Sequence, residues 1–254
     1  MELFYAEEPP DDGRLTLRGP EARHIARVLR HRVGDRVYVT DGRGNEYETE
    51  LVLVKADRVV GRVKGRLERP REPRHRVTLA QAVLKGDKLT QVCEQAAELG
   101  AGGFIPLQTA RTIGRLSPTK LARLRAVALS GMKSSTGTVA LDVHPMSLDA
   151  LAAGLGRFDQ ALAAYEEERR VGLDEVLRPD VESLLVIVGP EGGFEPHEIQ
   201  ALQQAGAVSF SMGPRRLRAE TAGIVTLAMV MQLLGDLGWH EHETTLKGGA
   251  IGSW

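Results

Sequence analysis

The sequence predicts an α/β protein in which a mostly parallel sheet carries helices on both faces, preceded by a smaller β-rich module. From Val77 onward, apolar runs of strand length alternate with helical patterns, which is the rhythm of a parallel sheet. Residues 1–70 instead hold several short β-rich runs and one helical segment. Between them, residues 71–76 contain arginine and proline but no apolar residue, which indicates a linker between two domains.

The module of residues 1–70 is predicted to fold as a compact barrel. Its strands are expected at Leu3–Tyr5, Leu15–Leu17, Arg36–Thr40, Tyr47–Lys55 and Val59–Leu67. A single helix is predicted over Pro20–Arg30, where apolar residues recur along one side. Arg23, Arg27 and Arg30 follow one another at i, i+4 and i+7, so their guanidinium groups are expected on one face of this helix. Such a face can follow a phosphate backbone, although a solvated helix face has the same pattern.

Charge is distributed unevenly along a chain whose net charge is only −1. Basic residues, most of them arginine, outnumber acidic ones in residues 1–76, whereas acidic residues are in excess in residues 77–254. The front module is therefore the part of the chain that favours contact with phosphate.

The second module is expected to alternate strands and helices over residues 77–243. Its strands are predicted at Val77–Leu84, Phe104–Leu107, Val139–Val143, Ala161–Tyr165, Leu184–Val188 and Val208–Ser211. Its helices are predicted over Leu89–Leu99, Ser117–Met132, Leu148–Leu155, Pro196–Ala205 and Ala219–Leu237. Prolines at first helical positions and glycines just past the ends support these bounds. Residues 244–254, rich in glycine, are expected to form a flexible tail.

Two strand–glycine loop–helix units follow one another between residues 184 and 222. The run Leu184–Val188 is entirely apolar, which is typical of a strand buried on both faces. Loops that follow parallel strands emerge at the carboxyl edge of the sheet, where open α/β folds bind ligands. Neither loop has the pattern of a P-loop or of the dinucleotide fingerprint. Glu191, amid the glycines of the first loop, favours a cationic ligand, but two ordinary strand-to-helix turns would have the same pattern.

The sequences G-P-E-G-G-F at 189–194 and M-G-P-R-R-L-R-A-E-T-A at 212–222 resemble the two signatures of the RsmE-type 16S rRNA (uracil-N3)-methyltransferases of the SPOUT superfamily. K-G-D-K at 85–88, E-L-G at 98–100 and Arg111 also match, so the resemblance spans nearly the whole chain. It implies a trefoil-knotted SPOUT methyltransferase domain at 77–243, a PUA-like RNA-binding barrel at 1–70, S-adenosyl-L-methionine as cofactor and a homodimer. Gln95, Arg216 and the K-S-S-T-G of 133–137 depart from the family pattern.

The function that the resemblance implies is S-adenosylmethionine-dependent methylation of uridine N3 in 16S rRNA, as a step of rRNA processing and ribosome biogenesis in the cytoplasm. The partner would be 16S rRNA or the small ribosomal subunit. Two alternatives remain open: a SPOUT methyltransferase acting on another RNA base or a ribose hydroxyl, and a non-catalytic RNA-binding factor in ribosome assembly. A single cysteine, Cys93, excludes an internal disulfide, and no membrane-length apolar run or metal-ligand spacing is present.

The residues expected to line the cofactor come from the two glycine loops and one neighbouring strand end: Ala164, Gly189, Pro190, Glu191, Gly192, Met212, Gly213 and Leu217. For Met212 and Leu217, simple core packing is the competing explanation. The expected RNA-binding residues are Arg23, Arg27, Arg30, Lys85, Lys88 and Arg111.

Methylation of uridine N3 also requires that the proton on this nitrogen leave. Arg218 and Arg215 could stabilise charge that builds on the flanking carbonyl oxygens, while Glu220 or Glu191 could take the proton. Glu220 is equally explained as a first-turn carboxylate favoured by the helix dipole, so the sequence does not fix the base.

Overall fold

The structure is a computed structural model that describes residues 2–114 and 116–238. The chain forms two compact units. The described part of the first unit comprises residues 2–72 and 132–140, and that of the second comprises residues 73–114, 116–131 and 141–238. The predicted tail at 244–254 lies outside the described residues. No helix in the described part of the chain is long and apolar enough to cross a membrane.

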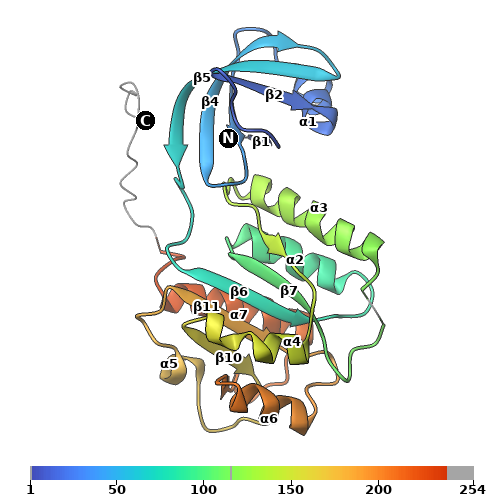
Figure 1. The fold of residues 1–254 in the computed structure, drawn as a ribbon, viewed down its shortest axis with the longest axis vertical. Coiled ribbons are helices and arrows are strands. Elements are labelled where there is room, and N and C mark those ends of the chain that lie inside the picture. The colour runs from blue at the N-terminus through green and yellow to red at the C-terminus, as the bar shows by residue number, and fades with distance from the viewer. Residues whose placement is uncertain (1, 115, 239–254) are drawn as a thin grey trace. The chain divides into compact units, whose positions relative to one another are not determined.

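The first unit is built on a five-stranded sheet with the order β1-β3-β4-β5-β2 (Figure 1). The strands are β1 (Leu3–Tyr5), β2 (Arg14–Arg18), β3 (Arg36–Thr40), β4 (Asn45–Val54) and β5 (Arg58–Glu68). All neighbours are antiparallel except β1 and β3. Alternate residues such as Leu15, Leu17, Val37 and Val39 are buried in one apolar cluster, because successive side chains of a strand point to opposite faces.

The predicted single helix over Pro20–Arg30 is wrong in its second half. An α-helical turn, α1 (Gly19–Arg23), is followed by a π-helical turn, η1 (His24–Val28). In this turn the amide of Leu29 donates to the carbonyl of His24, five residues back, at 3.0 Å. Arg30 lies beyond the turn with a φ of 58°. Arg23, Arg27 and Arg30 are all exposed, but the wider turn removes the α-helical spacing that would stack them on one face.

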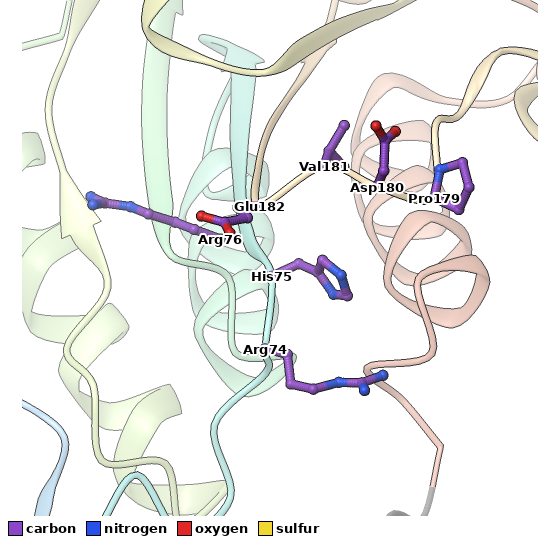
Figure 2. Close-up of a pocket in the computed structure, with 7 residues that line it drawn as sticks. All are labelled: Arg74, His75, Arg76, Pro179, Asp180, Val181 and Glu182. Carbon is purple, nitrogen blue, oxygen red and sulfur yellow. The ribbon is translucent and has the colours of Figure 1, made fainter.

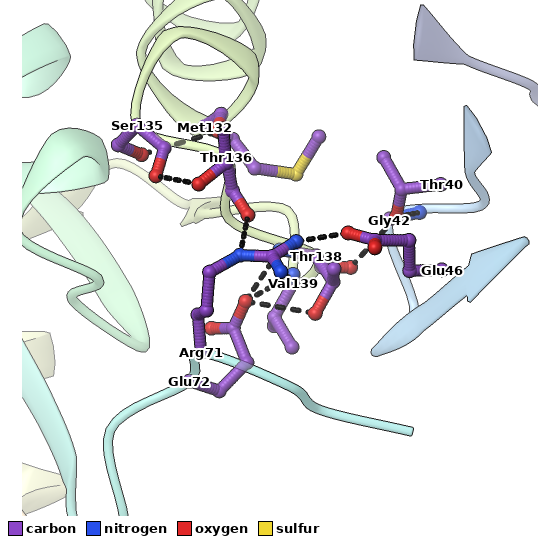
Figure 3. Close-up of polar contacts among 10 residues, drawn as sticks. All are labelled: Thr40, Gly42, Glu46, Arg71, Glu72, Met132, Ser135, Thr136, Thr138 and Val139. Carbon is purple, nitrogen blue, oxygen red and sulfur yellow. Dashed lines mark hydrogen bonds and ion pairs between the residues drawn. The ribbon is translucent and has the colours of Figure 1, made fainter. Parts of the chain in front are cut away.

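Residues 132–140 belong to the first unit, although their first three residues are the end of the helix Pro118–Ser134, most of which belongs to the second unit (Figure 3). Their backbone pairs with the β3–β4 turn: the amide of Ala140 donates to the carbonyl of Gly42 at 2.8 Å, and the amide of Gly44 donates to that of Thr138 at 2.9 Å. Val139 therefore forms a bridge with Arg43, and the expected strand Val139–Val143 shrinks to β8 (Asp142–Val143).

Two side chains at the end of the first unit hold this segment in place. One carboxylate oxygen of Glu72 accepts hydrogen bonds from the Thr138 amide, from the Thr138 hydroxyl at 2.9 Å and from the Val139 amide at 3.0 Å. Arg71 forms an ion pair with Glu46, whose side chain is buried, and donates to the carbonyl of Thr136 at 2.9 Å. The K-S-S-T-G segment of 133–137 thus lies within this packed corner of the first unit (Figure 3).

The second unit has a seven-stranded sheet in which every neighbouring pair is parallel, as the sequence predicts. Its order is β12-β10-β11-β6-β7-β8, and β9 pairs with β7. The strands are β6 (Arg76–Ala82), β7 (Gly103–Gln108), β8, β9 (Met146–Ser147), β10 (Gln160–Ala164), β11 (Ser183–Val188) and β12 (Val208–Phe210).

Helices cover both faces of this sheet (Figure 1). They are α2 (Lys88–Glu98), α3 (Pro118–Ser134), α4 (Leu148–Ala153), α5 (Leu173–Val176), α6 (Pro196–Gln204) and α7 (Ala219–Leu233), with a 3₁₀ turn, η2, at Leu155–Arg157. In β11, Leu184 and Val186 pack with residues of α2, α3 and α7, whereas Leu185 and Ile187 pack with residues of α4 and α6. The apolar run is therefore buried on both sides, as predicted.

The last helix, α7, lies over the middle of the sheet, although the strand before it lies at the edge. Strand β12 lies outermost, beyond β10, yet α7, which follows it, packs on α2, β6 and β11. The chain between them passes the loop after β10, where Ser211 forms a parallel bridge with Gly172 and its amide donates to the carbonyl of Val171 at 2.8 Å. This return brings the first turn of α7 to the middle of the sheet.

Candidate cofactor and catalytic site

Three adjacent strands end level with one another at the carboxyl edge of the second sheet. Ala164, the last residue of β10, pairs with Val188 at the end of β11 and with Phe210 at the end of β12. Val188 in turn pairs with Gln81, next to last in β6. The loops that follow these strands therefore leave from the same edge, and the two glycine loops lie together with Ala164, as the sequence analysis expected.

The first glycine loop, residues 189–195, is fixed by a tight turn. The amide of Gly193 donates to the carbonyl of Pro190 at 2.9 Å, and Gly193 has a φ of 72°, a conformation that favours glycine. A Cβ atom on Gly193 would lie 1.6 Å from a carboxylate oxygen of Glu166, so a side chain there would have to displace the exposed Glu166 side chain. Gly189 and Pro190 are buried, whereas Glu191 and Gly192 are exposed at the edge.

Arg111, expected to bind RNA, holds this loop through its guanidinium group. Its guanidinium donates to the carbonyl of Gly192 at 2.6 Å and to the carboxylate of Glu195 at 2.8 Å. The hydrogen bond to Glu195 raises the pKa of Arg111, and the same bond holds the pKa of Glu195 below its ordinary value. A second hydrogen bond joins the neighbouring residues of the same two segments: the amide of Ala110 donates to the buried carboxylate of Glu198 at 2.8 Å.

The second glycine loop, residues 211–218, leads into α7. Gly213 has a φ of 93°. The hydroxyl of Thr226 donates to the sulfur of Met212 at 3.1 Å, and Met212 packs on the apolar core, so core packing accounts for this side chain. Leu217 is half-buried. Arg218 is the N-cap residue of α7, so the free amides of the first helical turn point towards this edge.

Arg215 and Arg218, the expected stabilisers of charge, are both exposed on this loop. Neither side chain forms a hydrogen bond or an ion pair with another of the described residues. Both side chains are therefore available to a ligand at this edge.

The K-G-D-K segment brings a cation between two carboxylates of the site. The ammonium of Lys88 lies 3.0 Å from Oε1 of Glu220 and 3.9 Å from Oε1 of Glu191. The backbone amide of Lys85 donates to Oε1 of Glu191 at 3.2 Å. Lys88, expected to contact RNA, is thus engaged within the protein.

The pKa of Glu220 is held below its ordinary value. Burial raises the pKa of this carboxyl, but hydrogen bonds from its own backbone amide and from Lys88 lower it by more. Glu220 is therefore ionised at neutral pH, and its position in the first turn of α7 also favours the negative charge.

Gln81 is a member of the site that the sequence analysis missed. It lies in β6, is fully buried, and its side-chain amide donates to the carbonyl of Gly189 at 3.3 Å. The available signal was a polar residue inside the otherwise apolar strand that runs from Val77 to Leu84. Among the described residues, Oε1 of Gln81 and Oε2 of Glu220 are buried without a hydrogen-bond partner.

The described residues contain no group of three His, Cys, Asp or Glu side chains that could hold a metal ion. A hollow in the second unit lies at the opposite, amino-terminal ends of β6 and β11 (Figure 2). It is lined by Arg74, His75, Arg76, Pro179, Asp180, Val181 and Glu182. In its wall, His75 and the carboxylate of Asp236 approach to 3.0 Å. The hollow includes none of the residues expected to bind cofactor or RNA.

Both units match family models, and the whole chain matches curated proteins. Residues 70–231 match an RNA methyltransferase domain, and residues 17–64 match an RNA methyltransferase PUA domain. The ribosomal RNA small subunit methyltransferase E of Bacillus subtilis is 32% identical over 238 residues, which cover 88% of this chain and 91% of that protein. The protein of the same name from Mycobacterium bovis is 33% identical over 242 residues, 90% of each chain.

A solved structure is also similar over nearly its whole length. It is a ribosomal RNA small subunit methyltransferase E from Neisseria gonorrhoeae bound to S-adenosyl methionine, with a TM-score of 0.83, 25% identity, and coverage of 92% of this chain and 98% of that one. These matches confirm the predicted fold class, a SPOUT-type parallel sheet preceded by a PUA-like barrel. With both domain models matched and similarity to curated relatives over about nine-tenths of its length, the chain belongs to the ribosomal RNA small subunit methyltransferase E family of RNA methyltransferases.

Proposed function

We propose that the protein transfers the methyl group of S-adenosylmethionine to N3 of a uridine in 16S rRNA. The observation that carries this proposal is that β10, β11 and β12 end side by side at one edge of the sheet. The two glycine loops and the Lys88–Glu220 ion pair lie at this edge. Relatives of the family are small-subunit rRNA methyltransferases, and one of them has been solved with the cofactor bound.

The residues at this edge fit the cofactor. Glu191 and Glu220 place two carboxylates at this edge, which suits a ligand that carries a sulfonium and an ammonium group. A Cβ atom on Gly192 would meet only the side chain of Arg111, and one on Gly213 would meet nothing within 4 Å, so both loops leave backbone open to a ligand. The bound cofactor supplies an electrophilic methyl group.

The residues of the chain supply position and charge. Methyl transfer is an in-line displacement, so its rate depends on how firmly the loops hold donor and acceptor in line. Glu220, which is ionised, accepts the proton from uridine N3. Arg215 and Arg218, exposed beside the first turn of α7, donate to the uracil carbonyl oxygens on which negative charge builds.

The first unit contributes contacts to the RNA backbone through Arg23, Arg27 and Arg30. All three are exposed around the π-helical turn, and the matched PUA domain of this family of RNA methyltransferases begins just before them. In the second unit, Lys85 is exposed at the edge of the site and contributes a further phosphate contact.

The enzyme acts as a homodimer joined through α7. Val225, Met229 and Leu233 are exposed at four-residue intervals along this helix, and Leu237 continues the series just beyond its end. Four exposed apolar side chains in one row are the pattern of a surface that a second copy covers. The expected place of action is the cytoplasm, where the small ribosomal subunit is assembled.

The test is a transfer assay with radiolabelled S-adenosylmethionine and unmodified small ribosomal subunits, in which mass spectrometry identifies the modified nucleoside. We expect N3-methyluridine. Another methylated base or a 2′-O-methylated ribose would keep the reaction and change the target. Cofactor binding without transfer to any ribosomal or transfer RNA would favour a non-catalytic assembly factor and overturn the enzymatic proposal.

A further inference from the structure

Gln81 is the only fully buried glutamine among the described residues, and it lies in the central strand of the second sheet. In β6 it pairs with Val188 on one side and with Pro106 on the other. Val188 is the last residue before the first glycine loop, so the Gln81 side chain lies at the level where that loop begins. A buried amide at this position costs free energy unless its polar atoms find partners.

The orientation of the Gln81 amide follows from its one partner. The carbonyl of Gly189 can only accept a hydrogen bond, so the atom 3.3 Å from it is the nitrogen Nε2, which donates. The oxygen Oε1 therefore points away from the loop. It is buried and has no partner among the described residues. A buried acceptor without a donor destabilises the fold, so the position of this oxygen calls for a partner.

The helix that covers Gln81 has a glycine beside this oxygen. A Cβ atom on Gly223 of α7 would lie 2.2 Å from Oε1, so a larger residue there would displace the Gln81 side chain from this position. A glycine in a helix interior is less favourable than alanine, so the close approach of α7 to Oε1 comes at a cost to the helix.

A second buried acceptor without a donor belongs to Glu220, about one helical turn before Gly223. Oε1 of Glu220 pairs with Lys88 at 3.0 Å, but Oε2 is buried without a partner among the described residues. The two free oxygens therefore belong to the same end of α7 and to the strand beneath it. Acceptors without donors indicate a ligand that brings N–H groups, and S-adenosylmethionine has such groups on its adenine and on its amino-acid part.

From these contacts we propose that Gln81 is a positioning residue of the cofactor site. Its nitrogen holds the Gly189 carbonyl of the first glycine loop. Its oxygen, together with Glu220, accepts hydrogen bonds from an N–H donor of S-adenosylmethionine. This inference rests on the proposed function, because it takes that cofactor as the ligand. It adds a residue from β6 to a site otherwise made of the loops after β10, β11 and β12.

The experiment measures cofactor affinity by isothermal titration calorimetry on the full chain and on two variants. Gln81→Met keeps the length of the side chain but removes both hydrogen bonds, and we expect about tenfold weaker binding of S-adenosylmethionine. Gln81→Glu keeps an oxygen acceptor and should bind more tightly than Gln81→Met. Thr78→Val, a buried polar residue in the amino-terminal half of β6, is the matched control and should bind as the wild type does.

A double-mutant cycle then tests the pairing with Glu220. If both oxygens accept from one bound ligand, the losses in Gln81→Met and Glu220→Gln should not add, since either change disturbs the same donor group. Repeating the titrations with 5′-methylthioadenosine, which lacks the amino-acid part, assigns the donor. A penalty that persists places it on the nucleoside, and a penalty that vanishes places it on the amino group.

The outcomes separate this inference from the proposed function. Wild-type protein that binds no S-adenosylmethionine would overturn the function. Wild-type protein that binds it, together with folded Gln81→Met protein of equal affinity, would overturn only the role of Gln81. Thermal melting without ligand identifies a purely structural role: in that case the melting temperature of Gln81→Met would fall while its affinity at a temperature where it is folded stayed unchanged.

Discussion

The ammonium of Lys88 lies 3.0 Å from Oε1 of Glu220 and links the first turn of α2 to the first turn of α7. The two residues are far apart in sequence, and each sits at the start of a helix at the carboxyl edge of the sheet. Because the pKa of Glu220 is lowered partly by Lys88, this ion pair sets the pH above which Glu220 can accept a proton.

Replacing Lys88 by methionine should raise the pKa of Glu220, since a hydrogen bond and a positive charge are removed while the burial that raises it remains. A carboxylate that acts as base is active above its pKa, so the acid limb of the pH–rate profile should move to higher pH. Lys88→Arg keeps the charge and should leave the limb near its original place. A limb that does not move in Lys88→Met would show that another group takes the proton.

Gly192→Val should separate cofactor binding from folding. Gly192 does not have a positive φ, and a Cβ atom there meets only the flexible side chain of Arg111 at 3.4 Å, so the fold should accept a side chain. The bulk would then stand where we place the cofactor, and affinity measured by calorimetry should fall by about tenfold or more.

The control for this change is Gly156→Val, at an exposed glycine whose added Cβ atom would also meet nothing within 4 Å. Its cofactor affinity should equal that of the wild type. Near-native affinity in a folded Gly192→Val variant would mean that the first glycine loop does not face the cofactor.

Local patterns in the sequence were sufficient to predict the parallel sheet and the meeting of the two glycine loops. An all-apolar run such as Leu184–Val188 is buried on both faces wherever it lies, and parallel strands bring the loops at their ends to one edge. The partners of individual side chains could not be predicted in this way. Arg111 pairs with Glu195, which lies 84 residues further along the chain, and Gln81 contacts Gly223, which is more distant still. Such contacts depend on how the whole chain folds and not on local sequence.

The same limit explains the two errors in the fold. Val139 has the pattern of a strand residue, but it forms a bridge with Arg43 in the turn between β3 and β4, and its amide donates to Glu72 rather than to a strand of the neighbouring sheet. The spacing of apolar residues in Pro20–Arg30 indicates a helix but does not distinguish an α-helical turn from a π-helical one. With the wider π-helical turn, Ala22 and Ile25 are buried in the barrel core, while Val28 is 65% exposed.

Arg23→Ala combined with Arg27→Ala should weaken RNA binding without changing cofactor affinity. Both side chains are exposed and belong to the first unit, whereas the residues proposed for the cofactor belong to the second. Loss of two phosphate contacts should reduce the slope of log affinity against log salt by about 1.5. Arg58→Ala with Arg62→Ala, which removes equal charge from exposed positions of β5, is the control. An unchanged salt slope in the first variant would place the RNA elsewhere.

Glu72→Ala should destabilise the first unit. One oxygen of Glu72 accepts three hydrogen bonds from Thr138 and Val139, and truncation leaves these donors without their acceptor (Figure 3). We expect the free energy of unfolding in urea to fall by about 2–4 kcal/mol. Glu72→Gln retains an oxygen acceptor and should lose less, while Glu68→Ala, at an exposed position, should be nearly neutral. Equal stability of Glu72→Ala and Glu68→Ala would mean that residues 132–140 are held by other contacts.

Met229→Glu combined with Leu233→Glu should convert the proposed homodimer to a monomer. Both side chains belong to the exposed row on α7, and fully burying such a side chain contributes about 1.5–3 kcal/mol, whereas a carboxylate buried there would be unpaired. Analytical ultracentrifugation over a range of concentrations measures the change. Gln200→Glu, which adds a charge to the exposed side of α6, should leave the dimer intact.

The thermal stability of this variant, followed by circular dichroism, distinguishes the interface from the core. The row faces outward, whereas Leu227, Val230 and Met231 of the same helix are fully buried, so the isolated subunit should keep its secondary structure. A wild-type protein that is monomeric at micromolar concentration would contradict the dimer. If the variant remained dimeric, the two copies would have to meet through another face, and the exposed row on α7 would be left for a different partner.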